Sequence, residues 1–179
     1  MRRKMSHQSQ IDFVAGVKRK FPEYFSNTKV LEVGSLDING SVRQFFDNCT
    51  YIGVDIGEGK GVDLVCKGED LAFPENDFHV SISCECFEHN PEWIKTFDNM
   101  ARMTSGLVIM TCATTGRPEH GTSRTSRSDA PFCGDYYMNL TENDIKANCN
   151  FSKFLAYGFS TCDSPADLYF WGITKNQKA

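Results

Sequence analysis

The sequence lacks any apolar run near the ~20 residues that a membrane-spanning helix requires. No Cys-x-x-Cys pair occurs among its eight cysteines, so a structural zinc site has little support. Basic residues are not in excess: the formal net charge of −4 argues against a broad basic surface for duplex nucleic acid. The basic opening Met1–Lys4 is not followed by the apolar stretch of a secretory signal. We therefore expect a cytoplasmic protein with no membrane segment, for which nucleic acid is an unfavourable partner.

Internal repeats, low-complexity tracts and composition breaks are also lacking. With 179 residues, 40% of them hydrophobic, the chain can bury one sizeable core. We expect a single domain over residues 1–179, with an N-terminal helical segment over 1–28. The cysteines are scattered, and three of them (Cys66, Cys84 and Cys112) lie in or beside apolar β-like runs. They are interpreted as buried free thiols of an intracellular protein.

Short β-like runs alternate with helical or loop segments along the chain. The β-like runs are Lys29–Val33, Thr50–Val54, Val62–Cys66, His79–Ser83, Leu107–Cys112, Phe154–Tyr157 and Leu168–Thr174. Helical spacing of apolar residues predicts helices at Gln10–Phe25, Ser41–Phe46, Pro91–Met103 and Thr141–Asn148. This order is typical of a parallel sheet, but Gly158–Ala166 is too short for a parallel crossover between the last two strands. The predicted fold is Rossmann-like α/β: a seven-stranded, mostly parallel sheet with an antiparallel last strand and helices on both faces.

The first predicted strand ends in an acid, a glycine and a small residue: Glu32, Gly34 and Ser35. Open α/β sheets bind ligands at this carboxyl end, where glycine permits close backbone approach. Asp55 ends the second strand, 21 residues after Gly34, and an acid at that spacing suits the two ribose hydroxyls of an adenosine. A full G-x-G-x-x-G and a second nucleotide-binding half are missing, which argues against a dehydrogenase.

These segments resemble the class I S-adenosylmethionine-dependent methyltransferases, particularly their broad type 11 group. Leu31–Gly34 matches the first motif of that family and Gly53–Ile56 the second. The further segments that resemble it are Glu69–Pro74 beside the adenine, Phe78–Ser83 as the fourth strand, Phe87–His89 after it, and Arg102–Leu107 before the fifth strand. The chain departs from the family at Leu36 and Ile38, where glycines often stand, at Lys67, where an acid is usual near the adenine, and at His79, which replaces an acid.

The resemblance implies S-adenosylmethionine as cofactor and methyl transfer as activity. It places Gly34, Ser35 and Asp37 beside the methionine part, Asp55 on the ribose and Ile56 on the adenine. Glu69 and Asp70 would flank the adenine edge, with Cys84 and Glu85 below the sulfonium. The full set of cofactor-binding residues that it implies is Glu32, Gly34, Ser35, Asp37, Asp55, Ile56, Glu69, Asp70, Cys84 and Glu85.

Acidic and imidazole side chains gather after the fourth strand, in Cys84-Glu85-Cys86-Phe87-Glu88-His89. If the chain turns helical there, Glu85, Glu88 and His89 share one face, and His120 in the loop after the fifth strand reaches the same rim. Such a set suits Mg²⁺ or Mn²⁺, which would bind an acceptor hydroxyl and lower its pKa. It resembles the metal sites of small-RNA 2′-O-methyltransferases and of ubiquinone-pathway O-methyltransferases. Alternatively no metal binds, and His89 and His120 are candidate catalytic residues that act as a base or contact the substrate.

The loop 114–139 is long for a compact domain, and we expect it on the substrate side. Its arginines Arg117, Arg124 and Arg127 could receive a phosphate or carboxylate of a small acceptor. A solvated, flexible loop is the alternative interpretation.

The favoured function is an S-adenosylmethionine-dependent methyltransferase that methylates oxygen on a small or modest-sized acceptor. Two alternatives stay open: a non-catalytic S-adenosylmethionine-binding module, and a metal-assisted RNA ribose 2′-O-methyltransferase. Neither the acceptor nor the oligomeric state follows from the sequence.

Overall fold

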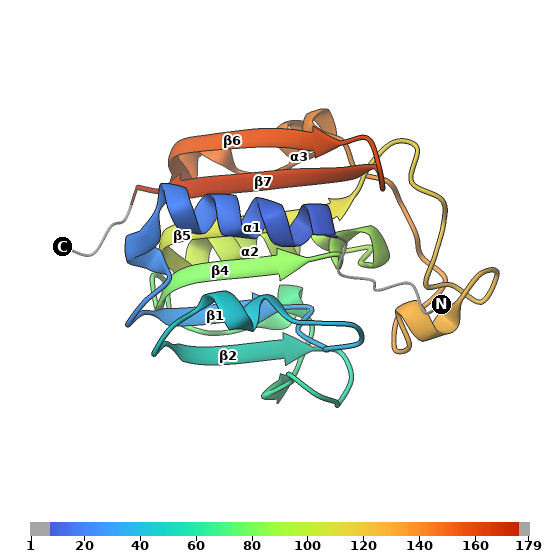
Figure 1. Ribbon diagram of the computed structural model, residues 1–179, viewed down its shortest axis with the longest axis horizontal. Helices are drawn as coiled ribbons and strands as arrows, with labels where there is room; N and C mark the ends of the chain where they lie inside the picture. The colour runs from blue at the N-terminus through green and yellow to red at the C-terminus, as the bar shows by residue number, and fades with distance from the viewer. Residues whose placement is uncertain (1–7, 176–179) are drawn as a thin grey trace.

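The computed structural model describes residues 8–175, which form one seven-stranded sheet with helices on its two faces (Figure 1). The strand order is β3-β2-β1-β4-β5-β7-β6. Strands β1 to β5 pair in parallel, and β7 runs antiparallel to both of its neighbours, β5 and β6. The predicted Rossmann-like sheet with an antiparallel last strand is therefore confirmed.

The strands are β1 Lys29–Val33, β2 Thr50–Asp55, β3 Leu64–Val65, β4 Phe78–Cys84, β5 Thr104–Ala113, β6 Phe154–Cys162 and β7 Asp167–Thr174. The α-helices are α1 Gln8–Lys20, α2 Trp93–Met103 and α3 Glu142–Asn148. Short 3-10 helices lie at η1 Pro22–Tyr24, η2 Val42–Phe45, η3 Gly68–Asp70, η4 Phe87–His89, η5 Arg127–Asp129 and η6 Phe151–Lys153. None of the helices within residues 8–175 has the length and hydrophobicity needed to cross a membrane.

Alternate residues of the strands point to opposite faces and build two separate apolar clusters. Val30 of β1 joins the cluster under α1, which includes Val14. Leu31 and Val33, which point to the other face of β1, join the cluster under α2, which includes Phe97. The period of two along a strand thus places one helical layer on each face. Strand β5 is buried over its whole length, because both layers cover it.

Several predicted elements differ from the observed ones, and the strand predicted to end at Tyr157 is β6, which continues to Cys162. The first helix ends at Lys20 and η1 follows it, because Pro22 has no N–H for a helical hydrogen bond. The predicted helix Ser41–Phe46 is the 3-10 turn η2, whose end is closed by the bond from Phe46 N to Arg43 O (3.1 Å). The third strand begins at Leu64, because Val62 N bonds to Gly59 O in a turn instead of joining the ladder.

All eight cysteines lie within the described residues and are free thiols. Only Cys112 is fully buried; the other seven are partly exposed. The prediction of free thiols is confirmed, and the prediction that all are buried is wrong. The partly exposed ones lie at strand ends and in connecting loops, where neighbouring elements cover them incompletely.

The centre of the α2-side cluster should dominate stability. Phe97 is fully buried, and its ring lies 5.3 Å from that of Phe170 and 6.3 Å from that of Phe87. We expect Phe97→Ala to lower the free energy of unfolding by about 3–5 kcal/mol, because it leaves a cavity among these rings. The exposed control Lys95→Ala should change it by less than about 0.5 kcal/mol. Urea unfolding measures both, and a loss below about 1 kcal/mol for Phe97→Ala would contradict this packing.

Candidate functional site

The carboxyl ends of β1, β2 and β4 lie in one row because of their register. Val33 pairs with Val54 of β2 on one side and with Ser83 of β4 on the other. The next residues along the three strands, Gly34, Asp55 and Cys84, therefore reach the same edge of the sheet. This edge is where the strand arrows of β1, β2 and β4 end in Figure 1.

Gly34 occupies a position that only glycine fits. Its φ is +81°, in the left-handed region that other residues rarely adopt. A Cβ atom there would lie 2.7 Å from Cys86 Cβ, so the turn after β1 and the turn after β4 touch. The sequence prediction of close backbone approach at Gly34 agrees with this geometry.

A cavity of about 520 Å³ opens at this edge, in the size range of ligand pockets. Eight of the ten predicted cofactor-binding residues line it: Glu32, Gly34, Ser35, Asp55, Ile56, Glu69, Cys84 and Glu85. Asp37 and Asp70 do not belong to its lining. The Asp37 carboxylate pairs with Lys60 (2.7 Å) and accepts a bond from Gly40 N, while Asp70 is exposed in η3. Asp37 and Asp70 were predicted to contact the cofactor, and in the structure neither lines the cavity.

Asp55 ties the two turns of the cavity together. Its Oδ2 accepts a hydrogen bond from Leu36 N (3.1 Å) and its Oδ1 accepts one from Gly57 N (3.3 Å). Partial burial raises the pKa of this carboxyl above its ordinary value. A carboxylate with two backbone donors keeps further lone pairs that can accept bonds from ligand hydroxyls.

Glu32 is a buried acid in the wall of the same cavity. Its Oε2 accepts a hydrogen bond from the Tyr51 hydroxyl (2.8 Å). Burial raises the pKa of the Glu32 carboxyl to about 7, although the Tyr51 bond opposes the shift. A cationic ligand group nearby would favour the ionised form.

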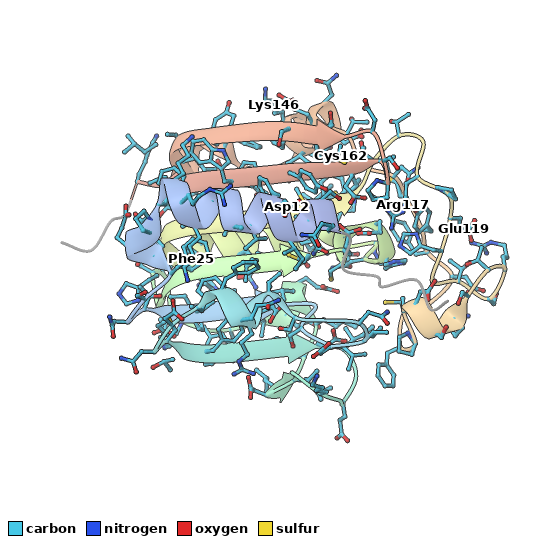
Figure 2. All side chains as sticks on the ribbon, in the orientation of Figure 1. Asp12, Phe25, Arg117, Glu119, Lys146 and Cys162 are labelled. Atoms are coloured by element: carbon cyan, nitrogen blue, oxygen red, sulfur yellow. The ribbon has the colours of Figure 1, made fainter. Side chains whose placement is uncertain are left out.

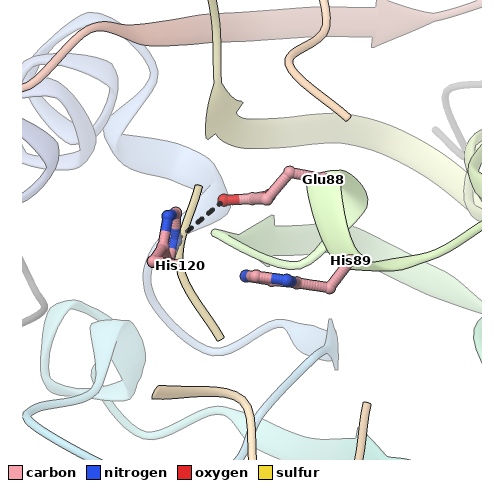
Figure 3. A group of neighbouring side chains, drawn as sticks. All are labelled: Glu88, His89 and His120. Carbon is pink, nitrogen blue, oxygen red and sulfur yellow. Dashed lines mark ion pairs between the residues drawn. The ribbon is translucent and has the colours of Figure 1, made fainter. Parts of the chain in front are cut away.

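A second group of polar side chains, Glu88, His89 and His120, meets beside the cavity (Figure 3). One ligand atom of each lies within 4.8 Å of the others. His120 Nε2 is 3.9 Å from Glu88 Oε1, and the two imidazole rings stand edge to face with centroids 4.9 Å apart. Of the three, His89 also lines the cavity.

The predicted fourth member, Glu85, is not part of this group, and the predicted helix that would align it is absent. Glu85 has a φ of +53°, which interrupts any helix at that position. The segment instead forms the 3-10 turn η4, and Glu85 Oε1 accepts a bond from Thr111 Oγ1 (2.9 Å). Glu85 lines the cavity instead, and the structure brings together three of the four predicted metal ligands.

Burial disfavours the charged form of all three side chains. It raises the pKa of the fully buried Glu88 carboxyl to about 7 and lowers that of His89 to about 4. The pKa of His120 is lowered as well, by burial first. Among the described residues, Glu88 Oε2 and His89 Nδ1 are buried without a hydrogen-bond partner. Both atoms are therefore available to bond a ligand, an ion or a water molecule.

The three arginines of the loop 114–139 are engaged within the chain. Arg117 pairs with the buried Asp167 (2.8 Å), at the start of the loop near the sheet edge (Figure 2). Arg124 pairs with Glu119 and Arg127 with Asp135, each at 2.7 Å. These contacts account for the arginines without an anionic acceptor, and they give the loop a defined conformation.

Sequence reasoning missed several residues of the site. Asn90, Phe132 and Cys133 line the cavity, as does Gln10 of α1. Tyr137 lies beside the imidazoles, with its ring 5.5 Å from His89 and 5.1 Å from His120. The length of the loop 114–139 signalled its importance, but nothing in its sequence shows which positions turn inward.

Comparison with known proteins identifies the fold. No family model matches the sequence, and no curated protein matches it significantly. Among solved structures, the phosphoethanolamine N-methyltransferase 2 of Haemonchus contortus has a TM-score of 0.65 at 16% identity, covering 93% of this chain and 53% of that one. The magnesium protoporphyrin IX methyltransferase of Synechocystis, with bound S-adenosylmethionine, scores 0.64 at 13% identity, covering 95% and 80%. The chain has the fold of an S-adenosylmethionine-dependent methyltransferase.

A third similar structure widens the range of chemistry on this methyltransferase fold. The CurJ carbon methyltransferase has a TM-score of 0.60 at 14% identity, covering 90% of this chain and 52% of that one. This chain thus spans about half the length of two of the three structures. The atom that is methylated differs among them and cannot be inferred from the methyltransferase fold.

The buried Glu32 makes stability depend on pH. Its folded pKa is about 7, above the ordinary 4.5, so its stabilising contribution is complete below pH 4.5 and is lost as pH rises through 7. We expect the ligand-free Glu32→Gln variant to gain stability relative to the unaltered protein between pH 5 and pH 8. Urea unfolding across that range measures the difference. The exposed control Glu23→Gln should show no such trend, and a constant difference for Glu32→Gln would contradict the burial argument.

Proposed function

We propose that the cavity at the ends of β1, β2 and β4 binds S-adenosylmethionine and that the protein transfers its methyl group to an oxygen of a small acceptor. The observation that carries the proposal is the convergence of Gly34, Asp55 and Glu85 on one cavity of ligand size. The fold comparison supports the same cofactor, because similar structures hold S-adenosylmethionine or S-adenosylhomocysteine.

In this proposal each wall of the cavity recognises one part of the cofactor. Asp55 accepts bonds from the ribose hydroxyls, and Ile56 packs on the adenine. The turn at Gly34 and Ser35 lies beside the methionine part. Glu32, Cys84 and Glu85 also line the cavity, and the two acids complement the cationic ammonium and sulfonium groups.

Methyl transfer needs little covalent help from the protein. The acceptor oxygen attacks the methyl carbon in line with the C–S bond, and the bonding pair leaves on sulfur. A hydroxyl acceptor also releases a proton, for which a neutral imidazole is a suitable base. His89 lines the cavity and is uncharged at neutral pH, because burial lowers its pKa to about 4. It can accept a proton there, and a pKa this low makes it a weak base. The proposal of a hydroxyl oxygen as the acceptor atom rests on this neutral imidazole in the wall of the cavity.

Glu88, His89 and His120 also fit a divalent cation. Two buried atoms of this group without a partner within residues 8–175, Glu88 Oε2 and His89 Nδ1, are a carboxylate oxygen and an imidazole nitrogen. This mixed set suits Mn²⁺ better than Mg²⁺, which prefers oxygen ligands. A bound cation would lower the pKa of an acceptor hydroxyl. The chain's own part is to hold these three donors close together and to shield them from water.

Removing the ribose partner should weaken cofactor binding. We expect Asp55→Ala to reduce the affinity for S-adenosylmethionine by about 1–3 kcal/mol, because charge-assisted hydrogen bonds are lost. Calorimetry measures the affinity, with Asp12→Ala on the exposed face of α1 as a control of unchanged binding. Equal affinities of Asp55→Ala and the unaltered protein would exclude the ribose assignment.

The cation proposal gives a second test. Mn²⁺ titrated into the protein should give saturable heat, and Glu88→Gln or His120→Ala should abolish it, because each removes one of three ligands. Glu119→Gln is the matched control, since that carboxylate lies in the same loop but pairs with Arg124. If millimolar Mn²⁺ gives no saturable heat with the unaltered protein, the group holds no cation and His89 remains as base.

A further inference from the structure

Phe132 of the long loop lies against the backbone that follows Asp55. A Cβ atom placed on Gly57 would be 2.0 Å from Phe132 Cδ2, so the ring rests directly on that glycine. The φ of Gly57 is not in the left-handed region, so the close ring, and not backbone geometry, requires a glycine here. The aromatic ring is thereby fixed two residues from the acid proposed to hold the ribose.

The ring and its neighbours form part of the cavity wall. Residues 130–134 line the same cavity as Gly34 and Asp55. Two large apolar side chains there are solvent-exposed: Phe132 at 51% and Ile56 at 42%. Exposed apolar groups at the mouth of a cavity are typical of a surface that a flat apolar ligand covers.

Polar contacts hold the loop in place around Phe132. Arg127 donates to Cys133 O and pairs with Asp135, whose carboxylate also accepts bonds from Ser123 N (2.9 Å) and Ser123 Oγ (2.6 Å). Arg124 donates to Asp135 O (2.9 Å). The segment is therefore positioned before any ligand arrives, which reduces the entropy cost of binding.

We infer that Phe132 is an adenine-binding residue, and that residues 130–134 of the loop cover the adenosine in the cavity. The inference rests on the proposed cofactor and adds a contact from outside the sheet. An aromatic ring suits adenine because both present flat π faces, and such stacking tolerates a partly exposed site. The contact with Gly57 holds the Phe132 ring in this position.

Calorimetry with two probes, S-adenosylhomocysteine and 5′-methylthioadenosine, tests the inference, since both contain the adenosine. Phe132→Ala should weaken both by the same factor, roughly 5- to 100-fold. Gly57→Ala should also weaken both, because its methyl group displaces the ring. In the Phe132→Ala background, Gly57→Ala should add less than about two-fold, since no ring remains to be displaced. Phe132→Tyr should restore binding.

Leu155→Ala, which removes an exposed apolar side chain from β6, is the matched control, and thermal unfolding shows that each variant is folded. The inference would be overturned if the Phe132→Ala variant bound S-adenosylhomocysteine with an affinity within about two-fold of that of the unaltered protein. The inference would also be overturned if Phe132→Ala lowered the affinity for S-adenosylhomocysteine but not for 5′-methylthioadenosine. The same holds if the fold-loss of affinity in the double variant equalled the product of the losses in Gly57→Ala and Phe132→Ala. Failure of the unaltered protein to bind either probe would overturn the proposed function too, and this outcome is distinct from the others.

Discussion

The register of β1 with its two parallel neighbours is the constraint on which the site depends. Because Val33 pairs with both Val54 and Ser83, the turns after three strands begin at one level. Their backbones then approach closely, to the extent that Gly34 has no room for a Cβ beside Cys86. A shift of one residue in either pairing would move the strand-end side chains to the opposite face of the sheet. The position of the cavity is thus set by strand pairing, and the side chains that line it then determine its chemistry.

The loop 114–139 is the second structural contribution, and it serves both parts of the site. It brings His120 and Tyr137 to His89, and it brings Phe132 to Gly57. The two parts are linked within the loop, because a Cβ on Gly121 would lie 2.7 Å from His89 Cε1 and 2.8 Å from Ala130 Cβ. A displacement of the loop would therefore move the two imidazoles and residues 130–134 together.

The sequence predicted the seven strands and the antiparallel end of the sheet, because these follow from local signals: short apolar runs and a connection too short for a parallel crossover. It placed Gly34 and Asp55 at the carboxyl ends of the first two strands, because a short apolar run followed by a glycine or an acid marks where a strand ends. It failed at Glu85, since helical spacing was assumed where the backbone adopts a positive φ that tertiary contacts impose. It also missed Phe132, whose role depends on how a long loop folds back, and no periodic pattern records that. The partners of the loop arginines were not predicted for the same reason, because these carboxylates are non-local or lie in irregular backbone.

Three buried acids, of which Glu85 lines the cavity, favour a positively charged ligand. Glu85, Glu88 and Asp167 are buried near one another, and Arg117 lowers the pKa of each while burial raises it. Burial is the largest cause for each acid, and the one guanidinium that opposes it among residues 8–175 leaves all three pKa values above their ordinary range. A sulfonium or a divalent cation placed there would supply the missing positive charge and favour ionisation of the acids. After methyl transfer the sulfonium becomes a neutral thioether, and that part of the attraction is lost. The same electrostatics that would favour binding of the cofactor would thus favour release of its product.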